Sequence, residues 1–438
     1  MRMPRTIKIE CPERPPHADP FRDMVRQEVE VQVVTPMFGG GVRPGEPDPV
    51  TLIRVPEIRG HLRFWWRATR GAACSSTEEL RKRETEIWGD TENPSNVVVS
   101  THDAKFAERK ACAHYPPGKN FPRFEDNRLA YALFPFQGNP KKNELPGRGT
   151  HGISFRLSLS FPKNLQDDVR MPLWAWLNFG GLGARTRRGC GALFCKDFAP
   201  RSSDTKALEQ WLSERCRGLS FRTGSPQQEW PVFRPSMFVS KPEKNPLNAW
   251  AQAIQVLRLF RQGENVGRNP GQENRPGRSR WPEPEAVRTA TGRRAHKHPR
   301  LNQIPDNVYP RAEFGLPIIF HFKDDGEPED TSLEPSLEDS DRFSSPLILK
   351  PLACSDGNYL PSVIRLQGIL PATVRLKKVR GQSVVPVRSV HLSDYPNSPL
   401  GPCSHSGTPR SAAGSALDAF LSFITEPEQG FNRVEVRP

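Results

Sequence analysis

The chain has 438 residues, more than a single hydrophobic core usually serves, so two domains are expected. Lys and Arg number 63 against 49 Asp and Glu, and the net charge of +14 is compatible with a polyanionic partner without establishing one. The eight cysteines include no C-x-x-C pair, so neither a zinc site nor a disulfide framework is expected, and no metal or cofactor is predicted. The sequence shows no secretory signal and no apolar run of membrane-spanning length, which predicts a cytoplasmic protein without membrane contact.

The first 200 residues alternate strand and helix patterns. Val29, Val31 and Val33 alternate with polar residues over 27–35, as in a half-buried strand. The further elements predicted here are a helix at 56–70, a strand at 96–100, a strand at 153–161, a helix at 171–179 and a strand at 192–198. Residues 101–150 have weak periodicity and are predicted to be an insertion. The order is that of the split βαβ, ferredoxin-like fold, whose open sheet face or edge loops would be free to hold RNA.

The second half is expected to repeat this architecture with more decoration. Its predicted elements are helices at 206–219, 245–263 and 415–424 and strands at 232–240, 316–322, 345–352, 362–370 and 431–437. The Gly-, Pro- and Arg-rich residues 263–312 are interpreted as a binding or interface insertion, and the acidic residues 324–341 as an exposed loop. The expected fold class is therefore α+β, with two tandem ferredoxin-like (RRM-like, βαββαβ) domains and long irregular insertions. The domains are placed at 25–200 and 231–438, joined by a connecting segment at 201–230.

A stripe of arginines marks the first predicted helix, PEIRGHLRFWWRATR. Arg59, Arg63, Arg67 and Arg70 follow one another at offsets of four, four and three, which places them on one helix face. With no acidic residue four positions away within the stripe, phosphate contact is favoured over a plain solvated face. Trp66 borders the stripe, where it either stacks on a base or, as the residue type favours, packs in the core.

The second marked segment is GGLGARTRRGCG, in which arginines interleave with glycines. Glycine-rich backbone can approach phosphates closely, and guanidinium groups bind them bidentately, so RNA contact is favoured over a simple tight turn. The candidate RNA-binding residues of this segment are Gly180, Gly181, Gly183, Arg185, Arg187, Arg188 and Gly189. We expect this loop and the arginine stripe to form one composite RNA surface.

A third basic group lies in the predicted 263–312 insertion. Arg293, Arg294 and Lys297 are candidates for RNA contact, and equally for contact with a neighbouring subunit or with solvent. His61 lies beside the arginine stripe and is included among the candidate RNA contacts. A general-base role for His61 in RNA cleavage is conceivable, but a lone histidine on a helix is more often structural.

The two marked segments resemble a known family. IRGHLRFWWRATRGA, preceded by VVTPMFGGG, resembles the N-terminal signature of the RAMP superfamily of CRISPR proteins, and within it the subunit-one group of type III-B (Cmr) effector complexes. GGLGARTRRGCGAL resembles the glycine-rich loop of that superfamily, and residues 277–288, 309–322 and 342–352 resemble the same subunit group. The similarity therefore touches both halves of the chain.

The resemblance implies a subunit of a multi-subunit ribonucleoprotein that serves antiviral defence. Its implied partners are crRNA, target RNA and other Cmr-type subunits. It implies a position remote from the 5′ tag of the crRNA, at the 3′ region of the guide, and no catalytic residues. Two alternatives stay open: a metal-independent endoribonuclease that matures precursor crRNA with His61 as base, and a structural cap with little RNA contact.

Overall fold

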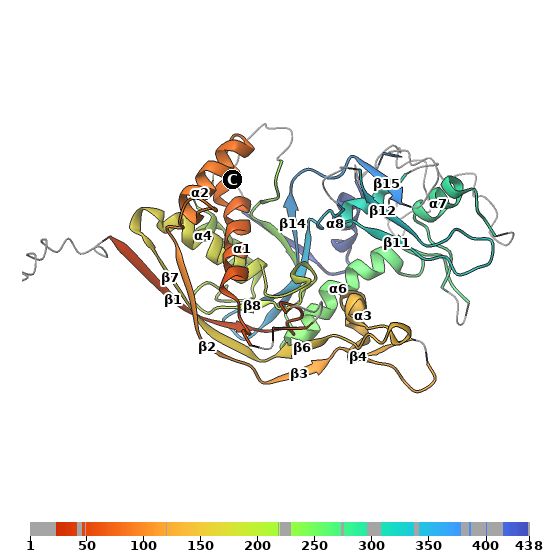
Figure 1. The fold of residues 1–438 in the computed structure, drawn as a ribbon, viewed down its shortest axis with the longest axis horizontal. Coiled ribbons are helices and arrows are strands. Elements are labelled where there is room, and N and C mark those ends of the chain that lie inside the picture. Colours follow the sequence, from red (N-terminus) through yellow and green to blue (C-terminus); the bar gives the residue numbers. More distant parts are fainter. Residues whose placement is uncertain are drawn as a thin grey trace, which may run out of the picture.

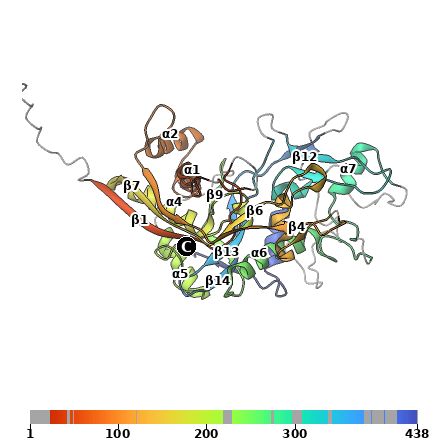
Figure 2. The same cartoon turned by 60° about the horizontal axis from the view of Figure 1, so that its bottom comes forward.

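The structure is a computed structural model of the chain. It describes residues 23–41, 46–48, 50–119, 121–217, 219, 229–272, 276–295, 308–336, 341–377, 385–386, 400 and 415–436. The fold is a mixed α/β arrangement of antiparallel sheets, drawn in Figures 1 and 2.

The first sheet is built from strands that are far apart in the sequence. Its strands are β1 (Met24–Val33), β2 (Val98–Lys105), β7 (Ile153–Pro162) and β8 (Leu193–Phe194). They are hydrogen-bonded in the order β2-β7-β1-β8, and all three pairings are antiparallel. The alternation in β1 buries Val29, Val31 and Val33 and exposes Glu28 and Glu30. The open face of this sheet therefore carries both signs of charge, because Glu28 lies 3.4 Å from Arg26 and 3.5 Å from Arg156.

Two helices cover the other face of the sheet, α1 (Val55–Ala68) and α4 (Gln166–Phe179), and they pack against each other. A third helix, α2 (Thr77–Trp88), follows α1 and was not among the predicted elements. Its N-terminus is capped because the Ser76 hydroxyl accepts a hydrogen bond from the Glu79 backbone N–H at 3.2 Å. A serine followed three residues later by glutamate is a recognisable start signal for a helix.

The second sheet repeats the strand order of the first. Its main path runs β13-β14-β10-β17, made of β13 (Leu347–Ala353), β14 (Tyr359–Gln367), β10 (Ser236–Val239) and β17 (Asn432–Glu435), with the short β9 (Val232–Phe233) pairing with β14. Helix α6 (Pro246–Gln262) lies between β10 and β13 in the chain, and α8 (Ala416–Ile424) lies between β14 and β17. In both sheets the second, third, first and fourth strands of a βαββαβ unit therefore lie side by side.

The two sheets and their helices form successive layers with a shared core. Helices α1 and α4, with the connecting helix α5 (Thr205–Cys216), fill the space between the first sheet and one face of the second. Trp65, Trp174, Phe179, Trp211 and Phe233 interlock there, with ring centroids 4.7–6.4 Å apart. The other face of the second sheet packs on α6 and α8. Because both faces are covered, β13 is buried along its whole length.

Residues 101–150 are an ordered arm, which refines the predicted insertion. The arm contains β3 (Glu108–Ala111), β4 (Ala113–His114), β5 (Arg123–Phe124), the short helix α3 (Ala130–Leu133) and β6 (Arg148–His151). Leu129, Ala132 and Leu133 pack in the same core cluster as α6 of the second half. Figure 1 shows α3 beside α6. The arm therefore joins the first half of the chain to the second.

A third, smaller sheet forms a separate lobe with its own core. It runs β11-β12-β15-β16, from β11 (Ile318–Phe320), β12 (Thr331–Pro335), β15 (Thr373–Lys377) and β16 (Val385–Pro386), and it lies near α7 (Glu283–Thr291). The expectation of an exposed acidic loop at 324–341 is wrong in part, because β12 lies within it and Glu327 and Glu334 are buried. Asp325, Glu329 and Asp330 are exposed, and residues 337–340 lie outside the described residues. Arg288 donates to Glu327 at 2.7 Å, and Lys377 lies 3.4 Å from Glu334, so the two buried acids are neutralised internally.

Within the described part of the chain, no helix is long and apolar enough to cross a membrane. Six cysteines are described, and all of them are buried free thiols: Cys74, Cys112, Cys190, Cys195, Cys216 and Cys354.

Candidate functional site

The arginine stripe of α1 faces α2. Arg63 Nε and Arg67 Nη1 each donate to Glu84 Oε1 at 2.6 Å, and the Glu84 side chain is only 9% exposed. Arg59 donates to the Trp88 carbonyl at 3.1 Å, and Arg70 donates to Asp168 of α4 at 3.4 Å. Every arginine of the stripe thus has a partner within the protein. The partners come from other elements, which a search for acids within the helix itself does not reveal.

Trp66 lies in the core, which confirms the favoured alternative, and its place among the candidate RNA contacts is wrong. Its side chain is fully buried, and its indole N–H donates to Asp168 at 2.9 Å. The buried face of α1 is wide enough to include Trp66 as well as Trp65, so both side chains pack inward.

His61 lies on the opposite side of α1 from the stripe. Its Nε2 atom is 3.6 Å from Glu57 Oε1, and its ring stacks on Trp176 with centroids 6.1 Å apart. The residues that the structure describes contain no group of three His, Cys, Asp or Glu side chains able to hold a metal ion. His61 therefore contacts one carboxylate, that of Glu57, and its ring is held by packing on Trp176, as is typical of a structural side chain.

The glycine loop, residues 180–191, follows α4 and lies against the first half of α1. The Gly183 N–H donates to Glu57 Oε1 at 2.5 Å, and the Gly181 carbonyl accepts from Trp176 Nε1 at 3.1 Å. Gly183 has φ +80°, and a Cβ atom there would lie 2.3 Å from the Phe38 carbonyl oxygen. A side chain at this position would therefore displace the backbone, which explains the glycine. The loop and α1 do come together, but on the face of α1 away from the arginine stripe.

Two arginines of the loop reach across to the second half of the chain. Arg188 Nη1 donates to the Leu347 carbonyl at 2.9 Å, and Arg187 donates to the Ser345 carbonyl. Arg187 also lies over the Phe64 ring, 5.3 Å from its centroid. Burial lowers the pKa of Arg187 to about 10 and that of Arg188 to about 9. These carbonyl partners carry no net charge, so both guanidinium charges stay uncompensated.

Of the three arginines in the loop, Arg185 is the least held by hydrogen bonds to other described residues. It adopts φ +59°, a left-handed conformation that is costly for a residue with a side chain. Burial lowers its pKa, and its buried Nε atom has no hydrogen-bond partner within the described part of the chain. A strained backbone together with a desolvated Nε atom that lacks a partner among the described residues makes Arg185 a candidate ligand-binding residue.

Arg261, at the end of α6, completes a cluster that the sequence did not reveal. Its Nη1 atom donates to the Tyr131 hydroxyl at 2.7 Å, and its guanidinium lies over the Phe314 ring, 5.6 Å from the centroid. Its charge, together with those of Arg185 and Arg187, acts on Arg188 and lowers the pKa of that residue. The sequence did not indicate that Arg261 belongs to this cluster, because its neighbours in space, residues 131, 188 and 314, are distant from it in the chain.

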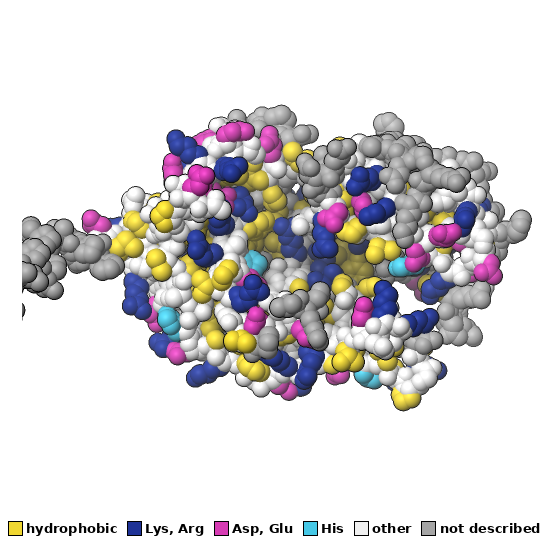
Figure 3. All heavy atoms as spheres, viewed as in Figure 1, with side chains coloured by type: hydrophobic (Ala, Val, Ile, Leu, Met, Phe, Trp, Pro, Cys, Tyr) yellow, Lys and Arg dark blue, Asp and Glu magenta, His cyan; other side chains and the backbone are white. Residues whose placement is uncertain are grey.

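We call Arg185, Arg187, Arg188 and Arg261 the arginine cluster. Among the described residues, none of the four has an aspartate or glutamate within salt-bridge distance, whereas nearby Arg311 is paired with Glu283 at 3.0 Å. Figure 3 shows Lys and Arg side chains gathered in the hollowed centre of one face, between the two lobes. Four like charges held together without a counter-charge form a ready site for an anion.

The third predicted basic group is partly neutralised. Arg294 is ion-paired with the buried Glu285, and Arg293 lies 2.8 Å from Glu329. Lys297 lies outside the described residues. One of these acids, Glu329, comes from the predicted acidic loop, and the other, Glu285, lies on α7. The structure does not bring this basic group to the arginine cluster.

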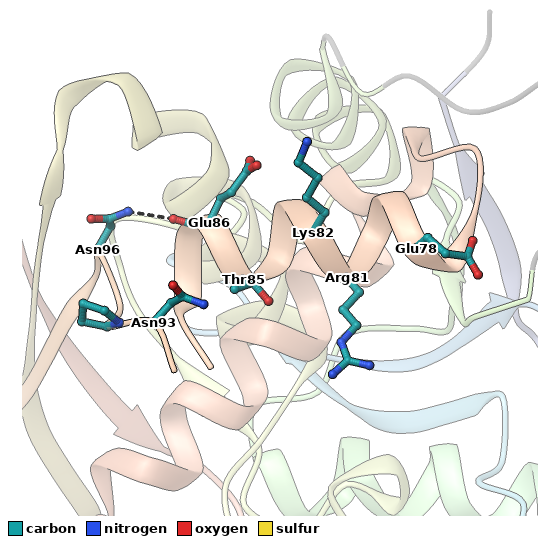
Figure 4. A pocket seen from close by; sticks show the side chains of 8 residues that line it. Glu78, Arg81, Lys82, Thr85, Glu86, Asn93 and Asn96 are labelled. Atoms are coloured by element: carbon teal, nitrogen blue, oxygen red, sulfur yellow. Dashed lines mark hydrogen bonds between the residues drawn. The ribbon is translucent and has the colours of Figure 1, made fainter. Parts of the chain in front are cut away.

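An open groove of about 800 Å³ runs along the exposed side of α2. Figure 4 shows Arg81 and Lys82 with Glu78 and Glu86 along the same helix, and a hydrogen bond of 2.7 Å from Asn96 to the Glu86 carbonyl. Because both signs of charge alternate along this helix, the groove offers no consistent field for a polyanion.

Comparison with known proteins supports the resemblance seen in the sequence. Residues 30–194 match the family model described as "RAMP superfamily". The CRISPR system Cmr subunit Cmr1-1 of Pyrococcus furiosus is 27% identical over 143 residues, which are 32% of this chain and 40% of that protein. Cmr subunit Cmr1-2 of the same organism is 26% identical over 175 residues, which are 37% of this chain and 91% of that protein. The alignment thus spans less than half of the first relative.

The fold is similar to the crystal structure of Cmr1 from Pyrococcus furiosus in its apo form. The TM-score is 0.51 at 17% identity, and the match covers 94% of this chain and 99% of that one. This similarity extends through the second half of the chain, beyond the region of the family model. Residues 30–194 therefore match the RAMP superfamily, and the chain is similar in sequence to the Cmr1 subunits of CRISPR systems over about a third of its length.

Proposed function

We propose that this protein is a non-catalytic RNA-binding subunit of a type III-B (Cmr) CRISPR complex, and that the arginine cluster holds the RNA backbone. The observation that carries this proposal is Arg185, a strained, desolvated arginine with no carboxylate partner among the described residues. The relatives named as Cmr subunits support the assembly, with other Cmr-type subunits, crRNA and target RNA as partners.

The energetics of the cluster favour a phosphate ligand. Burial disfavours the charged form of Arg187 and Arg188 in the free protein, as their lowered pKa values indicate. A phosphate placed among the guanidinium groups supplies the missing counter-charge and accepts several charge-assisted hydrogen bonds. The same burial strengthens each of these interactions relative to an exposed lysine or arginine. Binding therefore relieves an unfavourable arrangement that the free protein maintains.

The proposal includes a finer description of the fold, two tandem ferredoxin-like domains at about 25–200 and 231–438. The strand orders β2-β7-β1-β8 and β13-β14-β10-β17 support it, because each corresponds to a βαββαβ unit with antiparallel pairing. The arginine cluster would then lie where the loop after the last helix of the first domain meets the second domain.

The proposed place of this subunit in the complex is the end remote from the 5′ tag, at the 3′ region of the crRNA and the bound target. Reading of sequence would be left to pairing between guide and target, while this chain contacts the backbone. The arginine stripe of α1 contributes less in this proposal, because Arg63 and Arg67 share Glu84. Arg293 and Arg294 have acidic partners as well.

The decisive experiment measures binding of single-stranded RNA by the full chain at several salt concentrations. Arg185→Ala should weaken binding about tenfold and lower the salt slope by about one ion. Arg185→Lys should keep the slope and lose part of the affinity, since charge is retained without the planar fork. Arg258→Ala, on the exposed face of α6, is the matched control and should change neither. An Arg185→Ala protein with wild-type affinity and salt slope would contradict the proposal.

Two other outcomes would replace it. Specific cleavage of a repeat RNA in EDTA, abolished by His61→Ala, would make the protein a metal-independent endoribonuclease. Absence of any crosslink from the guide RNA to this chain in the assembled complex would make it a structural cap.

A further inference from the structure

A small pocket lies where the glycine loop meets the start of α1, and its lining residue Ala184 directly precedes Arg185 of the arginine cluster. Its volume is about 400 Å³, which suits a single sugar or nucleoside. It is lined by Gly40, Arg54, Pro56, Glu57, Gly183 and Ala184. Gly40 has φ +96°, and a Cβ atom there would approach Glu57 Oε2 at 3.9 Å. The glycine therefore keeps the space next to this carboxylate oxygen open.

The carboxylate of Glu57 is held in place from one side. Its Oε1 atom accepts the Gly183 N–H at 2.5 Å and lies 3.6 Å from His61 Nε2. Burial on its own raises the pKa of Glu57, but the hydrogen bonds from His61 and Gly183 and the charge of Arg54 leave that pKa below its ordinary value. Glu57 is therefore ionised at neutral pH and acts only as an acceptor, and among the described residues no donor to Oε2 competes with a donor from the pocket.

The ionised carboxylate of Glu57 determines which ligand groups can bind in the pocket. It repels a phosphate and accepts O–H or N–H groups. Gly183 and Arg185 are two residues apart, so their Cα atoms are separated by at most about 7 Å. A phosphate on Arg185 thus brings the attached ribose within reach of the pocket. An acidic residue that accepts a ribose hydroxyl next to a phosphate-binding glycine loop is a recurrent solution in nucleotide sites.

We infer that Glu57 accepts a hydrogen bond from the 2′-hydroxyl of the ribose attached to the phosphate at Arg185, and that this contact makes the protein select RNA over DNA. The inference rests on the proposed RNA-binding function and adds a specificity-determining residue to it. Deoxyribose leaves the Glu57 oxygen without a donor beside a polyanion, so DNA loses a hydrogen bond and keeps the repulsion. His61 positions Glu57.

The test uses the full chain and fluorescence anisotropy with 12-nucleotide strands of one mixed sequence, as RNA, as DNA with deoxyuridine in place of uridine, and as 2′-O-methyl RNA. Because the three strands carry the same bases, a preference among them reports the sugar. Wild-type protein should bind RNA about tenfold more tightly than either analogue. Glu57→Gln should narrow the ratio to about threefold, since the amide oxygen accepts more weakly and the repulsion of DNA is gone. Glu57→Ala should bring the ratio close to one.

Glu86→Gln, in the groove along α2, removes the same charge at a distance from the pocket and should leave the ratio unchanged. Thermal unfolding checks that each variant is folded. If Glu57→Ala does not fold, the 2′-O-methyl strand with wild-type protein and the Glu57→Gln variant decide the question. A 2′-O-methyl strand that binds as tightly as RNA would overturn the inference, as would a folded Glu57→Ala protein that keeps the wild-type ratio.

The inference and the proposed function fail differently. Arg185→Ala should weaken RNA and DNA by the same factor, because both carry the phosphate. Loss of this Arg185 effect contradicts the RNA-binding site itself. An intact Arg185 effect with an unaltered RNA-to-DNA ratio in Glu57→Ala contradicts only the role of Glu57, and a preference that follows base identity in place of the sugar does so as well.

Discussion

The arginine stripe of α1 and the arginine cluster around the glycine loop contain the same residue type in similar number, yet their surroundings differ. In the stripe, Arg63 and Arg67 share the carboxylate of Glu84. In the cluster, Arg187 and Arg188 donate only to backbone carbonyls. The stripe has carboxylate partners for three of its four arginines, whereas none of the cluster arginines has one among the described residues. A pattern of arginines in a sequence therefore indicates a phosphate site only when the acids supplied by other elements are known.

The largest expected effect concerns how the glycine loop docks on the second half of the chain. Gly189 has φ +82°, and a Cβ atom there would lie 2.4 Å from Trp250 Nε1 and 2.8 Å from the Leu349 carbonyl oxygen. Gly189→Ala should lower the free energy of unfolding by about 3 kcal/mol, from overpacking and the left-handed backbone together. Urea denaturation followed by tryptophan fluorescence measures this. Gly118, whose Cβ would meet nothing within 4 Å, is the control for backbone strain alone.

The next effect tests the comparison directly. Arg185→Ala with Arg261→Ala should weaken RNA binding about 100-fold, because two uncompensated charges are removed. Arg63→Ala with Arg67→Ala should weaken it by less than about threefold, because these charges already have a carboxylate partner. Anisotropy titrations at one fixed salt concentration compare the two double variants. Equal losses would show that the stripe and the cluster serve RNA alike.

The buried Lys350 tests whether water is excluded from the contact between the glycine loop and β13. It is fully buried on β13, its Nζ atom donates to the Gly180 carbonyl at 2.8 Å, and burial lowers its pKa to about 7. Between about pH 7 and the ordinary lysine value, the unfolded chain binds one proton more than the folded chain, so stability rises with pH. Relative to Lys350→Met, the wild-type protein should gain about 2 kcal/mol between about pH 7.5 and pH 9. Denaturation series across this range measure the difference, and parallel pH profiles would refute it.

Glu84 is the carboxylate on which the stripe depends. Glu84→Gln leaves Arg63 and Arg67 without their shared counter-charge and should cost about 2 kcal/mol of stability, an estimate reduced because both arginines are about one third exposed. The freed charges should at the same time raise RNA affinity slightly. Chemical denaturation gives the first quantity and anisotropy the second. A neutral effect on stability would mean that the stripe is held by packing alone.

The smallest effect comes from the strain at Arg185. Arg185→Gly should raise the free energy of unfolding by about 1 kcal/mol, because glycine adopts φ near +59° without cost. The same change should weaken RNA binding. Thermal unfolding and anisotropy on one protein preparation report both. A variant that is less stable than wild type would show that the guanidinium contributes to the fold more than to the ligand.

The strands and helices with strong periodicity were predictable from the sequence. β1 and β7 follow the alternation of Val29 to Val33 and of Ile153 to Phe161, and α1 follows the Arg59–Trp66 pattern. Helix α2 escaped notice because its sequence is mostly charged, although Ser76 and Glu79 signal its start. β12 escaped notice because Glu334 suggested exposure to solvent, whereas Arg375 and Lys377 of β15 neutralise this glutamate.

The sequence predicted the glycine loop as a candidate binding segment, but it did not point to the other residues of the proposed site. Arg261 comes from a helix of the second half and Tyr131 from the arm of the first half. The local sequence of neither segment indicates a binding residue. Glu57 looked like one acidic residue at a helix start, a position that the helix dipole alone explains. Its role depends on Gly183, which is 126 positions away in the sequence.

The arm at 101–150 has a consequence for how the chain is made. Phe136 stacks on Phe38 of the first half with ring centroids 4.6 Å apart, while Leu129 and Leu133 lie in a core completed by α6. During translation, α3 of the arm is synthesised more than a hundred residues before α6. During this interval the nascent first half presents an uncovered apolar strip, a condition that favours capture by chaperones or aggregation. Production of the first half by itself should therefore give insoluble protein, and co-expression of the second half should restore its solubility.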